Sequence, residues 1–397
     1  MIVNEKNANK VTKVGNIPLD WSLVELDEVA EVIDGDRSSR YPNQDDIVKQ
    51  GVLFLSTKNI NGSYFSFNER RFITEEKYKT ITKGKLRKND LVITMRGSIG
   101  KVALFKSVEF DRALINAQMS IIRPEKINSK YLWMALNSII MPRHLRIITS
   151  GSAQPQLTKK DVKKIPIIVP SEREQSEIVN ILSTWDKAIE LKQQLIDLKK
   201  EQKIGLMQKL LTEKNFMIEH QSYSKKLGDI CNISTGDKNN QDKIKDGEYP
   251  FFVRSENIEK INTYSYNGEA ILIPGDGRIG QIFHYINGKF DFHQRVYKIS
   301  DFSGNVSGKY IYYYLNKFFL KHALKFSAKA TVDSLRRPML TDFCIELPSL
   351  EKQNKIVEIL DVVQKQIDLQ NIELNVLKEQ KKGLMQQLLT GKTRVKV

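Results

Sequence analysis

The chain of 397 residues has few cysteines and no long apolar run. Cys231 and Cys344 are its only cysteines, so no disulfide framework is expected and a reducing, cytoplasmic location is the simplest prediction. The first ten residues, MIVNEKNANK, lack the apolar core of a secretory signal. No uncharged apolar stretch reaches the roughly 18 residues that a membrane helix needs. The sequence therefore predicts a protein that is neither secreted nor embedded in a membrane.

Signatures of catalysis and of metal binding are also missing. The chain contains no GxxxxGK[ST] phosphate loop, no GxSxG elbow, no CxxC pair, no HExxH motif and no NPPY- or DPPY-like motif. Gly275, Gly277 and Gly280 have the GxGxxG spacing of nucleotide loops, but a similar segment elsewhere keeps only Gly97 and Gly100. A turn between two strands therefore explains these glycines better. We expect no catalytic residue, no metal and no cofactor.

Acidic residues are outnumbered by basic ones. The chain has 63 Lys and Arg against 47 Asp and Glu, a net charge of +16, which favours a polyanionic partner. Residues 130–164 and residues 309–337 each hold seven basic residues and one acid. A charge that serves solubility alone is the alternative. The matching places of the two stretches in a duplicated chain favour nucleic acid.

A long repeat organises the chain. Residues 170–212 align without a gap with residues 348–390, and 21 of the 43 positions are identical. Both copies begin with Pro-Ser, contain no further proline and end in GLMQxLLT, which predicts two long helices. Apolar residues recur at heptad spacing in the second copy, so we predict that the two helices pair as an antiparallel coiled coil.

Two details of this coiled coil can be predicted. Lysines interrupt the heptad of the first helix, and a second stripe, Leu191–Leu195–Leu198, is expected to take over there. Met207, Met385 and Leu389 lie in the nearly identical segments, where we expect them to be exposed. A surface that is alike in both copies would suit two identical partners.

Shorter similarities relate the segments before the helices. Residues 26–36 resemble residues 227–237, residues 56–60 resemble residues 254–258, and residues 91–101 resemble residues 271–281. They predict two globular domains, each with short strands, then a helix, then a basic loop. The expected division is a polar tail (1–15), a first domain (16–169), a long helix (170–215), a second domain (216–347) and a long helix with a tail (348–397). The expected fold class is α+β, with two domains of mixed α/β type, each followed by a long helix, and with pseudo-two-fold symmetry.

The motifs together resemble one family. GLMQxLLT in both helices, the turns LVITMRGSIGK and ILIPGDGRIGQ, PLDW at residues 18–21, and the apolar-proline ends IPIIVP and IELP are similar to those of the specificity subunit of type I restriction-modification systems. The resemblance covers nearly the whole chain. It implies two target-recognition domains that each read one half of a bipartite site in double-stranded DNA, held apart by the helices. It also implies two methyltransferase subunits and restriction or translocase subunits as partners, and no catalytic site in the chain itself.

DNA-reading residues should lie in the loops of the two domains. Major-groove readout uses Arg or Lys toward guanine and Asn or Gln toward adenine. The candidates in the first domain are Arg37, Ser38, Arg40, Lys58, Asn59, Arg96, Ser98, Lys101, Asn116 and Gln118. The candidates in the second domain are Lys238, Asn239, Asn240, Gln241, Arg254, Asn257, Arg278, Gln281, His293, Gln294, Arg295, Arg336 and Arg337. Arg336 and Arg337 are predicted to contact phosphates.

The corresponding loops of the two domains differ in their side chains. RSSR in the first domain and KNNQ in the second cannot present the same donors and acceptors, so two unlike half-sites are predicted. Three other functions stay open at this point: a methyltransferase or endonuclease with unfamiliar motifs, a stand-alone DNA-binding regulator, and a coiled-coil adaptor that binds no DNA.

Overall fold

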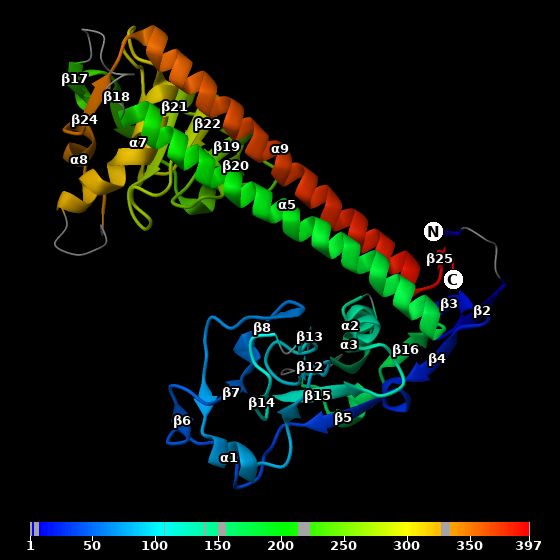
Figure 1. The fold of residues 1–397 in the computed structure, drawn as a ribbon. Helices are drawn as coiled ribbons and strands as arrows, with labels where there is room; N and C mark the ends of the chain where they lie inside the picture. Colours follow the sequence, from blue (N-terminus) through cyan, green and yellow to red (C-terminus); the bar gives the residue numbers. More distant parts are fainter. Residues whose placement is uncertain are drawn as a thin grey trace. The chain divides into compact units, whose positions relative to one another are not determined.

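The computed structural model describes residues 2–3, 8–106, 108–138, 140–149, 156–212, 223–326 and 334–396. The chain divides into two compact units: unit 1 comprises Met1–Leu191 and Leu374–Val397, and unit 2 comprises Lys192–Glu373. Each unit contains one globular domain and a part of both long helices, α5 (Glu172–Thr212) and α9 (Leu350–Leu389) (Figure 1). The predicted fold class, two mixed α/β domains that are each followed by a long helix, is confirmed. No helix in the described ranges is long and apolar enough to cross a membrane.

The domain of unit 2 is built on one six-stranded sheet in the order β18-β23-β21-β22-β19-β20. All neighbouring strands are antiparallel except β19 and β22, which run parallel. The helix α7 (Gly308–Ala323) packs on this sheet, where its buried aromatic and aliphatic side chains meet those of β21. The strands are β18 (Asn232–Thr235), β19 (Tyr249–Phe252), β20 (Ile258–Ile261), β21 (Tyr266–Pro274), β22 (His284–Phe292) and β23 (Val296–Ser300). Beside the sheet lie the paired strands β17 (Tyr223–Lys226) and β24 (Cys344–Leu347) and the short helix α8 (Arg337–Thr341).

The domain of unit 1 repeats this plan with its sheet divided in two. A four-stranded sheet has the order β13-β12-β15-β5, and a five-stranded sheet has the order β11-β14-β7-β10-β6. The single strand β22 of unit 2 corresponds to β13 and β14 together, since β14 runs parallel to β7 as the end of β22 runs parallel to β19. The interruption between β13 and β14 therefore accounts for the division of the sheet.

The remaining bounds of unit 1 are as follows. Its strands are β1 (Ile2–Val3), β2 (Asn9–Thr12), β3 (Gly15–Pro18), β4 (Ser22–Glu25), β5 (Ala30–Asp34), β6 (Ile47–Val48), β7 (Val52–Leu55), β8 (Ile60–Asn61), β9 (Tyr64–Phe65), β10 (Phe72–Ile73), β11 (Lys85–Leu86), β12 (Leu91–Thr94), β13 (Val102–Leu104), β14 (Ala113–Ile115), β15 (Met119–Pro124), β16 (Pro166–Val169) and β25 (Arg394–Val395). Its short helices are α1 (Glu75–Thr80), α2 (Ser129–Leu136), α3 (Ile140–Thr149) and α4 (Lys159–Lys163).

The same hydrogen bonds recur in both units near the point where each domain leads into its long helix. The Tyr131 hydroxyl donates to the Ile168 carbonyl at 2.9 Å in unit 1, and the Tyr310 hydroxyl donates to the Glu346 carbonyl at 2.8 Å in unit 2. The Oε1 atom of Gln175 accepts from the Asn128 backbone, as that of Gln353 accepts from the Ser307 backbone, each at 2.9 Å. The sequence repeat is therefore also a structural repeat.

The heptad of the long helices is continuous. Ile356, Leu360, Ile367 and Leu374 of α9 are buried, as predicted. The predicted second stripe of α5 is wrong. Leu191, Leu195 and Leu198 are 52%, 42% and 62% exposed. The helix keeps its phase instead.

Lysines occupy the core positions at which the heptad of α5 was expected to break. Lys192, Lys199 and Lys203 pair with Glu373, Gln366 and Gln364 of α9. A lysine tolerates such a position because its aliphatic stem packs in the seam while its ammonium reaches a polar partner at the edge. The order of these pairs makes the two helices antiparallel within unit 2.

The GLMQxLLT motifs are parts of the hydrophobic cores. Met207 and Leu389 are only 7% and 1% exposed and Met385 is half-buried, so the expectation that these residues form an exposed surface is wrong. The end of α5 packs beside Leu227 in unit 2, and the end of α9 packs beside Trp21 in unit 1. Completion of two similar cores therefore explains why the two motifs are alike.

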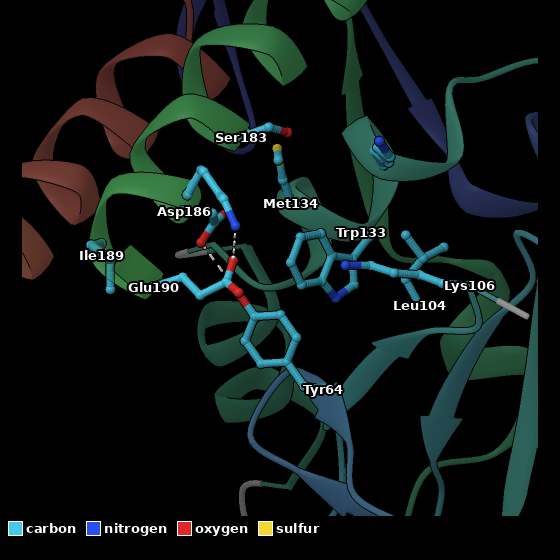
Figure 2. A pocket seen from close by; sticks show the side chains of 11 residues that line it. Tyr64, Leu104, Lys106, Trp133, Met134, Ser183, Asp186, Ile189 and Glu190 are labelled. Atoms are coloured by element: carbon cyan, nitrogen blue, oxygen red, sulfur yellow. Dashed lines mark hydrogen bonds and ion pairs between the residues drawn. The ribbon is translucent and has the colours of Figure 1, made fainter. Parts of the chain in front are cut away.

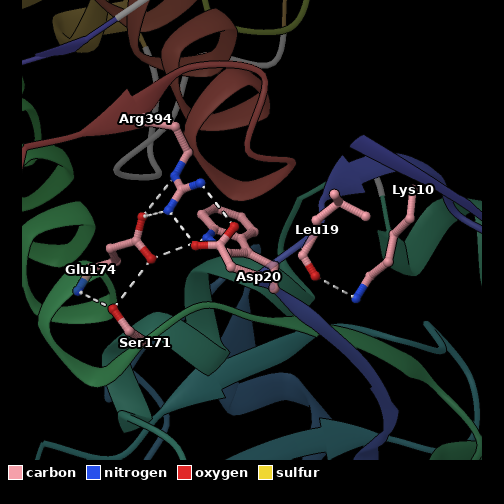
Figure 3. A network of polar contacts seen from close by, with 7 residues as sticks. Lys10, Leu19, Asp20, Ser171, Glu174 and Arg394 are labelled. Carbon is pink, nitrogen blue, oxygen red and sulfur yellow. Dashed lines mark hydrogen bonds and ion pairs between the residues drawn. The ribbon is translucent and has the colours of Figure 1, made fainter. Parts of the chain in front are cut away.

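A buried polar network joins distant segments of unit 1 (Figure 3). Glu174, which is 2% exposed, accepts from the indole of Trp21 at 3.1 Å and from Arg394 at 2.6 Å. Arg394 also donates to both carboxylate oxygens of Asp20, at 2.8 and 3.0 Å. Gly391 adopts φ +69°, and a Cβ atom there would lie 2.4 Å from Pro18. The PLDW motif therefore holds the end of the chain against the start of α5.

The two units differ where the domain meets its helix. In unit 2, Asp361 of α9 accepts from Lys309 at 2.6 Å and from Tyr313 at 2.7 Å. Ser183 and Met134 stand at the positions of Asp361 and Tyr313 in the repeat, and a cavity of about 510 Å³ lies there in unit 1 (Figure 2). Tyr64 closes one side, with its hydroxyl 3.4 Å from Asp186. None of the predicted DNA-reading residues lines this cavity, so it belongs to the packing of the domain on the helix.

Candidate nucleic-acid interface

Three loops of unit 1 that carry predicted DNA-reading residues lie against one another. The loop after β5 is bonded to β15 through Gly35, whose amide donates to the Met119 carbonyl at 3.2 Å. The turn after β12 is bonded to residues 116–118 through Met95, whose amide donates to the Gln118 carbonyl at 2.8 Å. A Cβ atom at Gly35 would lie 2.3 Å from the Asn116 carbonyl oxygen, so only glycine permits this approach.

Unit 2 assembles the equivalent loops by equivalent bonds. The Gly275 amide donates to the Arg295 carbonyl at 2.7 Å, as Met95 does to Gln118. The Gln294 amide donates to the Lys238 carbonyl at 2.8 Å. A Cβ atom at Gly236 would lie 2.0 Å from the Phe292 carbonyl oxygen, which repeats the approach at Gly35. The loops that correspond in sequence are therefore bonded to one another in the same way in the two domains.

The glycine-rich segments are turns between strands, as predicted. Gly97 and Gly277 have φ values of +73° and +81°, and Gly100 and Gly280 have values of +75° and +70°. These left-handed conformations favour glycine. Each turn joins two antiparallel strands, β12 to β13 and β21 to β22. We define the recognition face of each unit as this turn together with the loops bonded to it.

The candidates of unit 1 differ in how free their side chains are. Arg96, Ser98 and Gln118 are exposed on the recognition face, and Lys101 is half-buried. Arg37 and Arg40 are exposed and donate to the backbone carbonyls of Ala117 and Thr80. Five of these six side chains are therefore accessible to solvent.

Four other candidates of unit 1 make contacts within the fold. Asn59 is 4% exposed, and its amide bonds the backbone of Ser56, Ser66 and Glu69. The Asn116 amide oxygen accepts from the Gln118 backbone at 3.1 Å, and Lys58 pairs with Glu69 at 3.7 Å. A structural role explains Asn59 fully, because both ends of its amide are used.

Ser38, the fourth of these residues, donates hydrogen bonds to a buried acid. Its hydroxyl and its amide donate to the carboxylate of Asp36 at 2.6 and 2.7 Å. Burial alone would raise the pKa of Asp36, but these bonds and those from the backbones of Thr82 and Lys83 outweigh it and lower the pKa. Asp36 therefore stays charged and fixes the loop that carries Arg37 and Arg40.

In unit 2, the candidates interlock side chain by side chain. The Gln294 amide nitrogen donates to Asn239, and Arg278 pairs with Glu256 at 2.9 Å and contacts Gln281. The described side chains of Asn240, Gln241 and Asn257 are exposed, and Lys238 lies 3.9 Å from Asp237. This face therefore carries several amides and cations whose positions are fixed by their neighbours.

His293 is the least accessible candidate of unit 2. It is 4% exposed, and its Nδ1 atom accepts from the Arg295 amide at 2.9 Å. Burial and the nearby Arg254 guanidinium lower its pKa, so the ring is neutral near pH 7. Its hydrogen bond with Arg295 supports the loop of residues 293–295.

A segment toward the end of each basic stretch lies next to a recognition face. The Leu335 amide donates to the Gly275 carbonyl at 2.8 Å, and the Leu157 amide donates to the Met95 carbonyl at 2.9 Å. Arg336 and Arg337 follow at the start of α8 and are exposed. Lys329 and Asp333, which belong to the same predicted stretch, lie outside the described residues. Each face is therefore extended by a basic segment.

One important residue is absent from the predicted set. Asp276 lies in the turn of the recognition face of unit 2, where it contacts Arg254 and Arg295. Direct base readout favours cations, amides and hydroxyls, so an acid in this turn does not stand out in the sequence. The alignment of Asp276 with Arg96 was the available signal, since the two have opposite charges at one position of the repeat. Among the described residues, no group of three His, Cys, Asp or Glu side chains is placed to hold a metal ion.

Comparisons with known proteins agree with this arrangement. The family model described as the type I restriction modification DNA specificity domain matches residues 18–200 and 221–379. The type I restriction enzyme MjaVIII specificity subunit of Methanocaldococcus jannaschii is 24% identical, over 96% of this chain and 94% of its own length. The crystal structure of a type I restriction-modification S subunit from M. genitalium is similar in fold, with a TM-score of 0.56, 17% identity and coverage of 96% and 97%. A chain from a structural study of type I system assembly and conformational transition gives a TM-score of 0.62 at 17% identity, with coverage of 94% and 99%.

Proposed function

The chain belongs to the type I restriction-modification DNA specificity family, and we propose that it reads an asymmetric, bipartite site in double-stranded DNA with one recognition face per half-site. One observation carries the proposal: the two domains share a backbone frame but present different side chains on it. Arg96 and Gln118 of unit 1 stand where Asp276 and Arg295 stand in unit 2. Equal frames suit two half-sites of the same duplex, and unequal side chains suit two different base sequences.

We infer that the chain recognises DNA and leaves the chemistry to its partners. Methyltransferase subunits would methylate the site, and restriction or translocase subunits would join them. An enzyme with unfamiliar motifs is the first alternative, and the two can be distinguished because on our proposal the purified chain alone should neither methylate nor cleave DNA. A coiled-coil adaptor is the second alternative, and it would not bind DNA.

The test is a binding selection with the chain in complex with its methyltransferase subunits. A pool of duplexes with random sequence would be bound at two salt concentrations, and the bound fraction sequenced. We expect two unlike short motifs separated by an unspecified spacer of fixed length. A single motif, two identical motifs, or no preference would contradict the proposal, and binding that weakens equally across all sequences at higher salt would indicate non-specific contact.

Arg336 and Arg337 are expected to supply affinity without specificity. Replacing both with alanine should weaken binding by a similar factor for every sequence and reduce the slope of log K against log salt by up to about 2, at roughly 0.9 for each phosphate that is no longer neutralised. Fluorescence anisotropy at several salt concentrations measures both quantities. Lys382→Ala, which removes an exposed cation of α9 that pairs with Glu379, is the matched control and should leave the slope unchanged. Loss of preference at one base pair in the double variant would assign base contacts to these arginines instead.

The methyltransferase subunits would dock on an exposed apolar edge of the helix pair. In unit 2, Leu198 of α5 and Leu369 and Ile372 of α9 are 62%, 58% and 60% exposed. Lys199 contacts Gln366 in the same part of the helix pair, and the domain contacts α9 through Asp361. Exposed apolar side chains that form a patch are typical of interaction surfaces. Leu191 and Leu369 occupy equal positions of the repeat, so each helix offers a similar surface to one of two like partners.

A double substitution tests this docking edge. Leu198→Glu with Leu369→Glu should reduce methyltransferase association at least tenfold, because charge replaces apolar contact at the centre of the edge. It should leave the folded chain intact, since both side chains are exposed. Native mass spectrometry gives the stoichiometry, and Val11→Glu, at a residue 86% exposed in β2, is the control. Unchanged association, or one methyltransferase per chain in the active wild-type complex, would rule out two such sites.

A further inference from the structure

A single carboxylate on the recognition face of unit 2 holds two arginines. The Oδ2 atom of Asp276 accepts from Nη1 of Arg254 at 3.0 Å and from Nη1 of Arg295 at 3.2 Å. The three residues come from different loops, after β21, β19 and β22 respectively. The Asp276 side chain is 24% exposed, whereas those of Arg254 and Arg295 are 38% and 64% exposed. The acid is thus the most buried member, and the guanidinium groups are the accessible ones.

The backbone around these residues is also fixed. The Arg295 amide donates to His293 and its carbonyl accepts from Gly275, so the residue is bonded on both sides. Asp276 forms a β-bridge with Ser334. Because both arginines bond one oxygen atom, their Nη1 atoms lie within about 6 Å of each other, and like charges at that distance repel unless an acid lies between them. Hydrogen bonds from the two arginines outweigh burial and lower the pKa of Asp276, which keeps the carboxylate charged.

We propose that Asp276 is a positioning residue that fixes Arg254 and Arg295 as a pair of guanine readers for the half-site bound by unit 2. The inference rests on the proposed function and deepens it by naming the bases. A guanidinium has five N–H donors, and each arginine uses one of them to bond Asp276. A pair of N–H groups therefore remains on each arginine to bond O6 and N7 of guanine. Successive base pairs are about 3.4 Å apart, so two side chains at this spacing suit guanines at adjacent or next-adjacent pairs.

Unit 1 provides an internal contrast. At the backbone positions of Asp276 and Arg295 it has Arg96 and Gln118, as the matched bonds Gly275–Arg295 and Met95–Gln118 establish. Among the contacts of the described residues, no acid pairs with the Arg96 side chain. Among the described residues, direct pairing of one carboxylate with two arginines is therefore found on the second recognition face and not on the first, so its removal should affect one half-site.

The experiment compares wild type with Asp276→Asn in a selection from duplexes in which both half-sites and the spacer are randomised, using the full chain with its methyltransferase subunits. We expect guanine preference to fall in one half-site only, by about 5- to 150-fold per contacted guanine. Arg254→Lys and Arg295→Lys should have the same effect, because lysine keeps the charge but lacks the fork. Asp276→Glu should restore part of the preference, and Asp342→Asn, which breaks the ion pair with Lys226 in the same unit, should change neither half-site.

Other outcomes would overturn the inference. Unchanged preference in Asp276→Asn would mean that the arginines need no anchor. Equal weakening on all sequences, with lysine tolerated at both positions, would make them phosphate contacts. Loss of preference in both half-sites would place the effect on the fold, as would a lowered melting temperature that glutamate does not correct. A wild-type chain with no sequence preference would instead overturn the proposed function itself, so the two failures are distinguishable.

Discussion

Replacement of Arg394 by methionine should destabilise unit 1 by about 3 kcal/mol, because removal of one partner of a buried ion pair leaves the other charge uncompensated. Glu174 is 2% exposed and, among the described residues, its carboxylate would keep the Trp21 indole and the Ser171 hydroxyl as partners. We take the lower end of the usual range of about 3–5 kcal/mol, because the other partner of Arg394, Asp20, is 61% exposed. Of the two carboxylates that Arg394 contacts, Glu174 is the buried one, and this change leaves it without its cation.

Tryptophan fluorescence can follow this change in unit 1 selectively. The three tryptophans of the chain, Trp21, Trp133 and Trp185, all lie in unit 1, so urea denaturation monitored by their emission reports that unit even if unit 2 unfolds separately. Arg112→Met removes a pair with Glu75 that is bidentate but exposed, and it should cost less than about 1 kcal/mol. Glu174→Gln combined with Arg394→Met should recover much of the loss, since a neutral amide can still accept from Trp21. Equal effects of Arg394→Met and Arg112→Met would contradict the assignment.

The same network makes a prediction about acid stability. Hydrogen bonding to Arg394 is the main cause that lowers the pKa of Asp20. A carboxylate with a lowered folded-state pKa contributes stability above its unfolded-state pKa and loses it as the pH falls through the folded-state value. The stability of wild type should therefore fall more steeply below about pH 4 than that of Arg394→Met, in which Asp20 has no such partner. Parallel pH profiles would mean that the ion pair does not form in solution.

Much of the fold could be predicted because duplication leaves a strong signal. The bounds of the repeat, residues 170–212 and 348–390, agree with those of both long helices to within two residues, and the matched glycines located both turns. The partner of a lysine at a heptad core position could not be predicted. The sequence pattern treats Lys192 and Lys199 as interruptions, whereas in the folded chain their partners Glu373 and Gln366 come from the other helix. Such pairings depend on register between helices that are far apart in sequence.

The candidate site was predictable as a set of loops but not residue by residue. Arg96 and Asn59 both belong to matched loop segments, yet one is exposed and the other is buried with its amide fully bonded. Nothing in a single sequence distinguishes an asparagine that reads a base from one that closes a turn. Asp276 is a residue that the sequence did not single out. The reason to consider it is its contact with two arginines, which only the folded structure shows.

If the helix pair sets the spacer between the half-sites, the length of the helices should determine the length of the spacer. Insertion of seven residues into both α5 and α9, next to Leu191 and Leu374, would preserve the heptad phase and lengthen the pair by about 10.5 Å, at 1.5 Å per residue. At about 3.4 Å per base pair, the preferred spacer should grow by about three base pairs while both half-site sequences stay the same. Affinity for the original site should fall by roughly 10²- to 10⁴-fold, because the two domains could no longer bind it together and the gain from linked binding would disappear.

A pool of duplexes with fixed half-sites and every spacer from three base pairs shorter to six longer measures the change directly. The full range is needed because three base pairs also rotate one half-site by roughly a third of a turn relative to the other. Seven residues inserted into α5 alone form the control. That insertion shifts the register against α9 and should separate Lys199 from Gln366 and Lys203 from Gln364, so we expect loss of binding to all spacers and no new optimum. A matched insertion that still prefers the original spacer would show that the domains, and not the helices, determine the distance between the half-sites.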